Sequence, residues 1–255
     1  MRTPRFLQLA DGDTLHVYWR CTDSDNQYLL DRQASKEHFL KILGRNKERF
    51  GFTLYDYALM DNHQHLLLKI TTVKAFSRFL QCVNTSFAKH INKIKGRSGA
   101  VVKDRCKVSV LEPGDLHCML TCQIYFHLNR WVSAKKTPPE RYMHCGYRHY
   151  ALGETNPLLD HSPAWLALGK SDEERCSAFK AKVQARMDEK MSEETRLQLL
   201  ALEKPPRYLG SKAKVDLKTG KLRTAMREHL AALKARRLIQ DIADQIPAGS
   251  AREKK

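Results

Sequence analysis

Hydrophobic and polar positions in the first half of the chain follow two different periods. Short runs with alternating or β-branched residues predict four strands, at 13–21, 52–60, 63–70 and 100–111. Apolar residues at helical spacing predict three helices, at 35–51, from Thr72 to about 95, and at 115–131. Asp61 and Asn62 lie between the second and third strands and tolerate the backbone of a tight turn, which predicts a β-hairpin.

The resulting order β-α-β-β-α-β-α predicts an α+β fold. It is typical of a split β-α-β (ferredoxin- or RRM-like) arrangement, in which helices cover one face of an antiparallel sheet. Proline and glycine become frequent after Trp131, so we place a boundary near residue 160. Residues 1–160 are predicted to be the functional domain and residues 161–255 a basic, mainly helical C-terminal extension. Its helices are expected at 171–187, 192–202 and 222–240.

Charge and composition narrow the class of partner. Among 255 residues there are 45 Lys and Arg against 28 Asp and Glu, a net charge of +17. Such an excess favours a polyanion, with nucleic acid first and an anionic membrane surface second. No apolar run reaches the ~20 residues of a membrane span and no signal peptide is evident, so a cytoplasmic protein outside the membrane is expected. Seven cysteines without a CxxC pair indicate neither a disulfide framework nor a zinc knuckle.

Two histidines at the start of the third strand are the first candidates for chemistry. Strand alternation puts His63 and His65 on the same face, together with Leu67 and Lys69. Two neighbouring imidazoles on a rigid strand suit one divalent metal ion. Exposed or hydrogen-bonded histidines without a metal are the alternative interpretation.

The helix at 115–131 supplies the next candidates. Tyr125 and Asn129 are four residues apart and therefore point in the same direction, on the flank of the predicted buried stripe. For an isolated pair, a packing tyrosine and a helix-end asparagine remain an alternative interpretation. The stripe expected to be buried consists of Leu116, Leu120, Ile124, Leu128 and Trp131.

Together these segments resemble the single-tyrosine HUH transposases of insertion sequences, and among them the REP-associated tyrosine transposases. "MDNHQHLLL" is similar to the family's "MPNHxHLLL", and "IYFHLNR" to its "RYIHLNP". The segments at 86–108, 146–154 and 168–180 also resemble family segments, so that the likeness spans about residues 10–215. Asp61 and Arg130 stand where the family has proline, and Gln64 where an apolar residue is usual. A buried Gln64 needs a polar partner.

The resemblance implies a metal-dependent endonuclease and strand transferase that cleaves single-stranded DNA beside hairpins. It assigns His63 and His65 as metal ligands and Tyr125 as the nucleophile, and Asn129 is a candidate third ligand by its position. The ion, Mg²⁺ or Mn²⁺, would act as a Lewis acid on the scissile phosphate. Tyrosine would form a 5′-phosphotyrosine and leave a free 3′-hydroxyl. Such a link keeps the energy of the phosphodiester, so the strand can be rejoined without ATP.

Basic and aromatic side chains are candidates for DNA contacts, in either a monomer or a homodimer. Tyr142, Tyr147, Tyr150 and Trp165 could stack on unpaired bases if exposed. The basic residues expected to follow a phosphate backbone are Lys89, Lys93, Lys95, Arg97, Lys103, Arg105 and Lys107.

Three alternatives stay open at this point. The protein could be catalytically inactive and bind nucleic acid on the same fold. It could be a host-recruited derivative that still cleaves DNA. It could also be a metal-dependent hydrolase that uses water and forms no covalent adduct.

Overall fold

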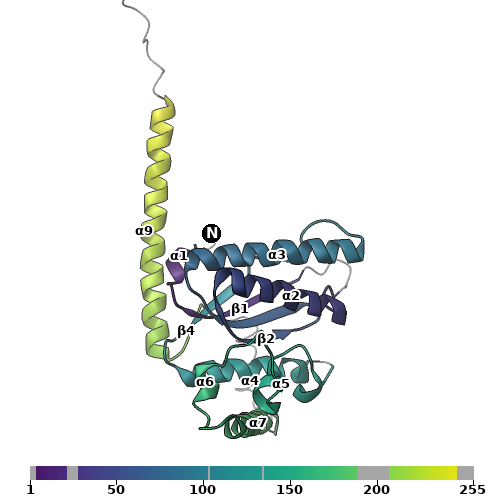
Figure 1. Cartoon of the computed structure of the whole chain (residues 1–255). Coiled ribbons are helices and arrows are strands. Elements are labelled where there is room, and N and C mark those ends of the chain that lie inside the picture. The colour runs from purple at the N-terminus through teal and green to yellow at the C-terminus, as the bar shows by residue number, and fades with distance from the viewer. Residues whose placement is uncertain (1–3, 22–27, 103, 134, 189–206, 246–255) are drawn as a thin grey trace, which may run out of the picture.

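The computed structural model describes residues 4–21, 28–102, 104–133, 135–188 and 207–245. A central sheet lies between two layers of helices, and one long helix projects away from this body (Figure 1). The helix expected at 192–202 lies outside the described residues.

The sheet consists of β1 (Thr14–Arg20), β2 (Thr53–Leu59), β3 (His63–Lys69), β4 (Lys107–Leu111) and β5 (Tyr208–Leu209). The strand order is β2-β3-β1-β4-β5, with β1 antiparallel to both of its neighbours. This order and the antiparallel β2–β3 hairpin confirm the predicted split β-α-β fold class. β5 adds a short parallel strand to β4, so the sheet is mixed. Two residues carry no strand period, which is why the sequence did not predict β5.

Two helices cover one face of the sheet, α2 (Gln33–Phe50) and α3 (Val73–Lys95). Phe39 of α2 connects these layers, with ring centroids 5.8 Å from Trp19 and 5.2 Å from Phe87. Thr72 caps α3 by accepting a hydrogen bond from the Ala75 N–H, as an N-terminal threonine can. The amphipathic pattern predicted both helices correctly.

Helix α4 (Leu116–Val132) lies on the opposite face, which corrects the expectation that helices cover one face only. Phe126 of α4 packs on the sheet, with ring centroids 5.1 Å from His16 and 5.3 Å from His65. The face that carries His65 is therefore an interior surface. Strand periodicity assigned this residue to the correct face but could not show what covers that face.

The buried side of α4 also differs from the predicted stripe. Leu116 is 40% exposed, whereas Tyr125 and Asn129 are buried. Tyr125 and Asn129 face His65 of the sheet, and further helices, α5 (Tyr147–Leu152), α6 (Pro163–Leu166) and α7 (Asp172–Asp188), cover α4 on its other side. α4 is thus enclosed between two layers, and polar side chains of the helix become interior groups.

A buried contact between two polar side chains joins α4 to strand β2. His127 Nε2 lies 2.9 Å from the Asp56 carboxylate, and neither side chain is exposed. Gln123 donates to the same carboxylate over 3.3 Å and accepts from Ser162 Oγ over 2.7 Å. Gly146 is required beside it, since a Cβ there would lie 2.2 Å from Asp56 Oδ1. This network fixes the position of the helix along the sheet.

The remaining described elements are α1 (Arg5–Gln8), a short 3₁₀ turn at Pro139–Arg141 and α9 (Lys212–Gln245). α9 begins ten residues before the predicted start at 222 and includes Gly220 in its interior. The division of the chain near residue 160 stays a prediction. Elements on either side of it are in contact, because β5 pairs with β4 and α7 packs on α4 and α5.

Candidate active site

Strand β3 holds the two histidines of the HxH pair in different environments. His63 is the first residue of β3 and is partly buried, and its backbone carbonyl accepts a hydrogen bond from Met60 across the turn over 2.8 Å. His65 lies two residues on and is 0% exposed. Their ring centroids are 5.1 Å apart, so the two imidazoles are neighbours as strand alternation predicted.

Asn129 of α4 lies against both histidines. Its amide NH₂ donates to His65 Nε2 over 3.1 Å. The same side chain also interacts with His63, where it partly offsets the lowering of the His63 pKa by burial. The structure therefore brings together His63, His65 and Asn129, the three residues that the sequence proposed as ligands.

A third histidine, which the sequence did not single out, completes this cluster. His16 of β1 is fully buried, and its Nε2 lies 2.9 Å from His65 Nδ1. Because His65 Nε2 accepts from Asn129, the His65 proton resides on Nδ1 and is donated to His16 Nε2. This chain of bonds keeps the Nε2 lone pair of His65 directed toward Asn129. A lone histidine in a hydrophobic strand gives no sequence signal for such a role.

Burial keeps these histidines neutral. It lowers the pKa of His16 to about 3 and that of His65 well below its ordinary value. The pKa of His63 falls to about 4, through burial first and then through the Arg20 guanidinium. A neutral imidazole carries the nitrogen lone pair that metal binding needs, and in His65 this lone pair accepts from Asn129.

Tyr125 of α4 packs directly beside the histidines. Its ring meets the His65 ring edge to face, with centroids 5.3 Å apart, and its centroid is 6.5 Å from that of His16. Only 2% of the residue is exposed. The phenol and Asn129 come from successive turns of one helix, so α4 contributes two of the candidate residues and β3 the other two.

The side chains present suit a divalent ion in an open site. Two imidazole nitrogens and an amide oxygen are accepted by Mn²⁺, and such a set leaves coordination positions for phosphate oxygens and water. Within the described residues, no group of three or more His, Cys, Asp or Glu side chains could hold a metal ion. A site here would thus depend on Asn129 in addition to the two histidines.

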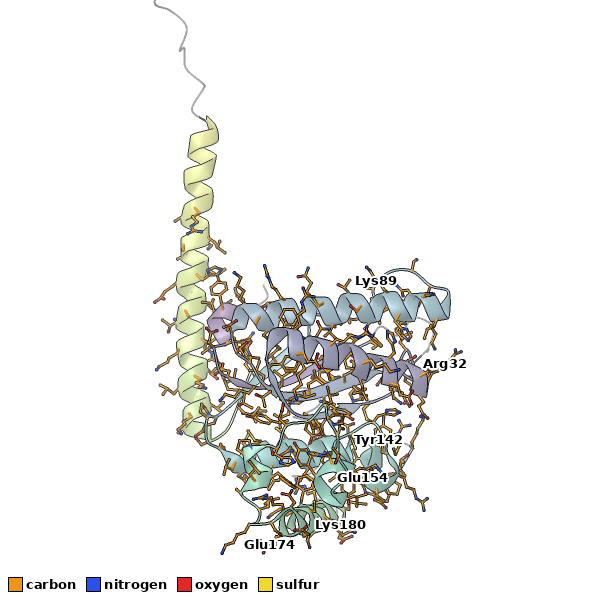
Figure 2. The ribbon with its side chains drawn as sticks, in the orientation of Figure 1. Arg32, Lys89, Tyr142, Glu154, Glu174 and Lys180 are labelled. Carbon is orange, nitrogen blue, oxygen red and sulfur yellow. The ribbon has the colours of Figure 1, made fainter. Side chains whose placement is uncertain are left out.

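The basic residues proposed to contact DNA are distributed over both sides of the sheet. Lys89 and Lys93 are exposed on α3, which covers the face opposite to Tyr125 (Figure 2). Lys95 is ion-paired with Asp31 over 3.3 Å, and Arg97 donates to the Ala100 carbonyl. Lys103 lies outside the described residues.

Lys107 is the member of this set that adjoins the candidate site. Its ammonium group lies 5.7 Å from the centroid of the Tyr18 ring. The Tyr18 ring in turn lies 4.9 Å from His65 and 5.6 Å from His63. Arg105 is also exposed, in a groove of about 880 Å³ that is lined by Arg5, Lys74 and Arg78.

The four aromatic residues proposed to stack on bases are interior residues, which corrects that expectation. Tyr142, Tyr147, Tyr150 and Trp165 are all less than 9% exposed. The Tyr150 hydroxyl donates to the Asp160 carbonyl over 3.0 Å, and Trp165 donates to the Tyr150 carbonyl. The clustering that suggested a stacking surface reflects the packing of α5, α6 and α7.

The buried Gln64 side chain has a polar partner at one of its two ends. Its side-chain nitrogen lies 3.7 Å from Cys21 Sγ on the α2 and α3 side of the sheet. Its side-chain oxygen has no hydrogen-bond partner among the described residues. The residue therefore belongs to the core behind the histidines.

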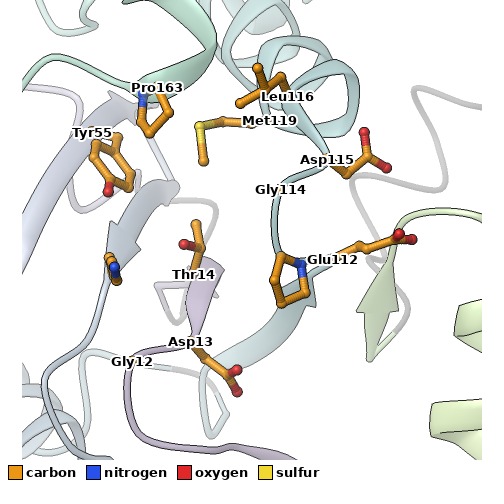
Figure 3. A pocket seen from close by; sticks show the side chains of 12 residues that line it. Gly12, Asp13, Thr14, Tyr55, Glu112, Gly114, Asp115, Leu116, Met119 and Pro163 are labelled. Atoms are coloured by element: carbon orange, nitrogen blue, oxygen red, sulfur yellow. The ribbon is translucent and has the colours of Figure 1, made fainter.

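A pocket of about 210 Å³ lies at the far end of the strands from His63 (Figure 3). Asp13, Glu112 and Asp115 are among its lining residues. Glu112 is ion-paired with Lys214 and accepts from the Ser211 N–H over 2.8 Å. An acidic pocket disfavours a polyanion, so this one does not compete with the histidine cluster for the role of the DNA site.

Comparison with known proteins shows which family the first part of the chain is similar to. Residues 13–107 match the family model described as "Transposase IS200 like". The resemblance to single-tyrosine transposases is thus confirmed over a stretch that contains His63 and His65 and ends before Tyr125. Transposases are DNA-processing enzymes, and that is the class to which the match points. No curated protein matches the chain.

Two solved structures are similar in their chain path. One is a REP-associated tyrosine transposase bound to a REP hairpin, with 11% identity and a TM-score of 0.45 over 60% of this chain and 88% of that one. The other, from Deinococcus radiodurans, is proposed to be a transposase and has 16% identity and a TM-score of 0.33, over 49% of this chain and 95% of that one. With both scores below 0.5, we draw on the family match alone. Within the described residues, no helix is long and apolar enough to cross a membrane.

Proposed function

We propose that this chain is a metal-dependent endonuclease and strand transferase for single-stranded DNA beside hairpins. The observation that carries the proposal is the convergence of His63, His65 and Asn129 beside the Tyr125 ring. The proposed roles are Tyr125 as nucleophile and the other three side chains as ligands of Mg²⁺ or Mn²⁺. The family match to IS200-like transposases supports this proposal, because the matched residues include strand β3 with both histidines.

The protein's own residues account for most of the chemistry. The Tyr125 oxygen attacks phosphorus, the bond from phosphorus to the 3′ oxygen of the preceding nucleotide breaks, and a 5′-phosphotyrosine forms. The phenol loses a proton, with a reference pKa of ~10, and the departing 3′ oxygen gains one, so that protons balance. When bound, the ion supplies Lewis-acid stabilisation of the charge that develops on the phosphate.

Burial of the site has a consequence for this reaction. Tyr125 is only 2% exposed. Its oxygen therefore reaches a phosphate only if helix α4 or the neighbouring Tyr18 side chain moves. Lys107 beside Tyr18 is suited to attract the backbone at that edge. We therefore place the entrance for DNA along the edge formed by Lys107, Tyr18 and His63.

The test is a denaturing gel with hairpin DNA that carries a labelled single-stranded flank. Wild-type protein with Mn²⁺ should shift the label to the size of a protein-DNA adduct, and EDTA should prevent the shift. A blunt duplex of the same sequence is the control substrate and should give little adduct. Free cleaved product without adduct would contradict the proposal and indicate a hydrolase that uses water.

A second function, nucleic-acid binding without catalysis, is favoured by one observation. His65 Nε2 is occupied by the Asn129 amide, as in a cluster of hydrogen-bonded core side chains. Hairpin binding with no adduct under Mg²⁺ or Mn²⁺ would support this function instead.

A further inference from the structure

Asp61 lies in a buried cluster of charges just before the HxH strand. Its Oδ1 accepts from Lys36 over 2.7 Å, and its Oδ2 accepts from Arg130 over 2.9 Å and from Lys135 over 2.8 Å. The side chains of Asp61, Lys36 and Arg130 are about nine-tenths or more buried, whereas that of Lys135 is 58% exposed. The three cations hold the pKa of Asp61 below its ordinary value despite its burial.

The cluster joins the two segments that carry the candidate ligands. Asp61 precedes His63 by two residues, and Arg130 directly follows Asn129. The Asp61 carbonyl also accepts from the Leu30 N–H over 2.8 Å, which ties the turn to the segment before α2. One ion pair therefore links the beginning of β3 to the last turn of α4.

Tyr142 provides a platform under both cations. The Arg130 guanidinium lies 5.1 Å from the centroid of its ring and the Lys36 ammonium 5.7 Å. The Tyr142 hydroxyl donates to the Leu59 carbonyl at the end of β2. Cation–π contacts and burial restrict the directions that these charges can adopt. The pair has more partners that restrict it than a typical surface ion pair has.

The same two positions depart from the motifs that the sequence resembles, where proline stands at both. Proline fixes the backbone through its ring. Asp61 and Arg130 are 69 residues apart in the sequence, and they are direct partners in the structure. One contact thus explains two departures that looked unrelated in the sequence.

We propose that the Asp61–Arg130 ion pair is a positioning device for the candidate metal site. It sets the distance between the turn that carries His63 and the helix end that carries Asn129. Buried ion pairs often contribute little to stability compared with apolar residues, and in some proteins they specify one geometry. The inference rests on the proposed function for the identity of the ligands.

The test compares Asp61→Asn, Arg130→Met and the double variant. Mn²⁺ affinity, measured by electron paramagnetic resonance on DNA-free protein, should fall about tenfold in each single variant, as for residues that orient metal ligands. The double variant should be no weaker than the singles, because both remove the same contact. Arg130→Met leaves Asp61 paired with Lys36 and Lys135 and is the variant expected to fold most securely.

Lys47→Met is the matched control. It removes a partly buried ion pair of similar length, 2.7 Å to Asp160, in contact with neither His63 nor Asn129. The control should lose thermal stability like Arg130→Met and keep its Mn²⁺ affinity. Equal Mn²⁺ affinity in wild type, Arg130→Met and Asp61→Asn would overturn the inference and leave the pair with a purely structural role.

A measurement on metal-free protein separates this inference from the proposed function. The Asn129 side-chain amide, observed by NMR, should shift and exchange faster with solvent in Arg130→Met and not in Lys47→Met. If wild type binds no Mn²⁺, the proposed function fails, and the amide signal still decides the inference. An unchanged Asn129 signal in Arg130→Met would overturn it.

Discussion

His16 Nε2 lies 2.9 Å from His65 Nδ1, and both rings are fully buried. Because the other nitrogen of His65 faces Asn129, the contact determines which nitrogen of His65 carries the proton. Metal-binding histidines generally have such a partner for the second ring nitrogen. His16 is thus placed to orient His65 without touching the ion or the DNA.

His16→Phe should therefore weaken Mn²⁺ binding by about ten- to a hundredfold, since the ring volume stays and the acceptor is lost. His16→Gln, whose amide oxygen can accept the same proton, should recover part of the affinity. The measurement is a Mn²⁺ titration of DNA-free protein, with His90→Phe on α3 as the control. Full affinity in His16→Phe would show that the contact has no role in the metal site.

Asn129→Ala should raise the Mn²⁺ concentration needed for adduct formation, because it removes the side chain that joins His63 and His65. Adduct should still form at high Mn²⁺, since both imidazoles remain. A loss of stability of about 1 kcal/mol is expected from the lost hydrogen bonds. If Asn129 is only a packing residue, stability falls and the metal dependence of adduct formation does not change.

Stability of the metal-free protein should fall between pH 6.5 and about 4. Burial lowers the pKa of His16 to about 3 and of His63 to about 4, whereas unfolded histidines titrate near ~6.5. The unfolded state thus binds more protons in this window, and stability increases with pH across it. Urea unfolding at a series of pH values measures the slope, which should be smaller in His16→Gln. An identical slope in both proteins would argue against a buried neutral His16.

Lys107→Ala should weaken binding of hairpin DNA and reduce the salt dependence by about 0.7 in log–log slope, as for one lost contact to a single strand. Lys89→Ala is the matched control, because it removes the same charge from α3 on the other side of the sheet. Fluorescence anisotropy at several salt concentrations measures both. Equal effects of the two variants would favour a DNA path over both faces instead of an entrance beside Tyr18.

The local pattern of hydrophobic and polar residues was sufficient to predict most of the fold. The alternation in β3 and the amphipathic stripe of α3 depend on near neighbours in the sequence, and both were predicted. The enclosure of α4 was not, because α5, α6 and α7 come from a segment rich in loops and cover it only in three dimensions. For the same reason Tyr150 was assigned to a surface.

Part of the candidate site could likewise be predicted from the sequence, and part of it needed the structure. His63 and His65 are two residues apart on a strand and Tyr125 and Asn129 four apart on a helix, so spacing predicted that each pair shares a face, and their roles came from the family resemblance. His16 could not be recognised in this way, because its partner His65 is 49 residues away. Asp61 and Arg130 were visible only as departures from a motif, and their contact needed the structure.

The central claim is that Tyr125 forms the covalent link to DNA. The direct measurement is peptide mass spectrometry of protein incubated with hairpin DNA and Mn²⁺, followed by nuclease and protease digestion, on wild type and Tyr125→Phe. We expect a nucleotide on the peptide that contains Tyr125 in the wild type, and no adduct in Tyr125→Phe, which keeps nearly all the packing and should still bind the hairpin. A nucleotide on a peptide with Tyr142, Tyr147 or Tyr150, or an adduct that persists in Tyr125→Phe, would contradict the account.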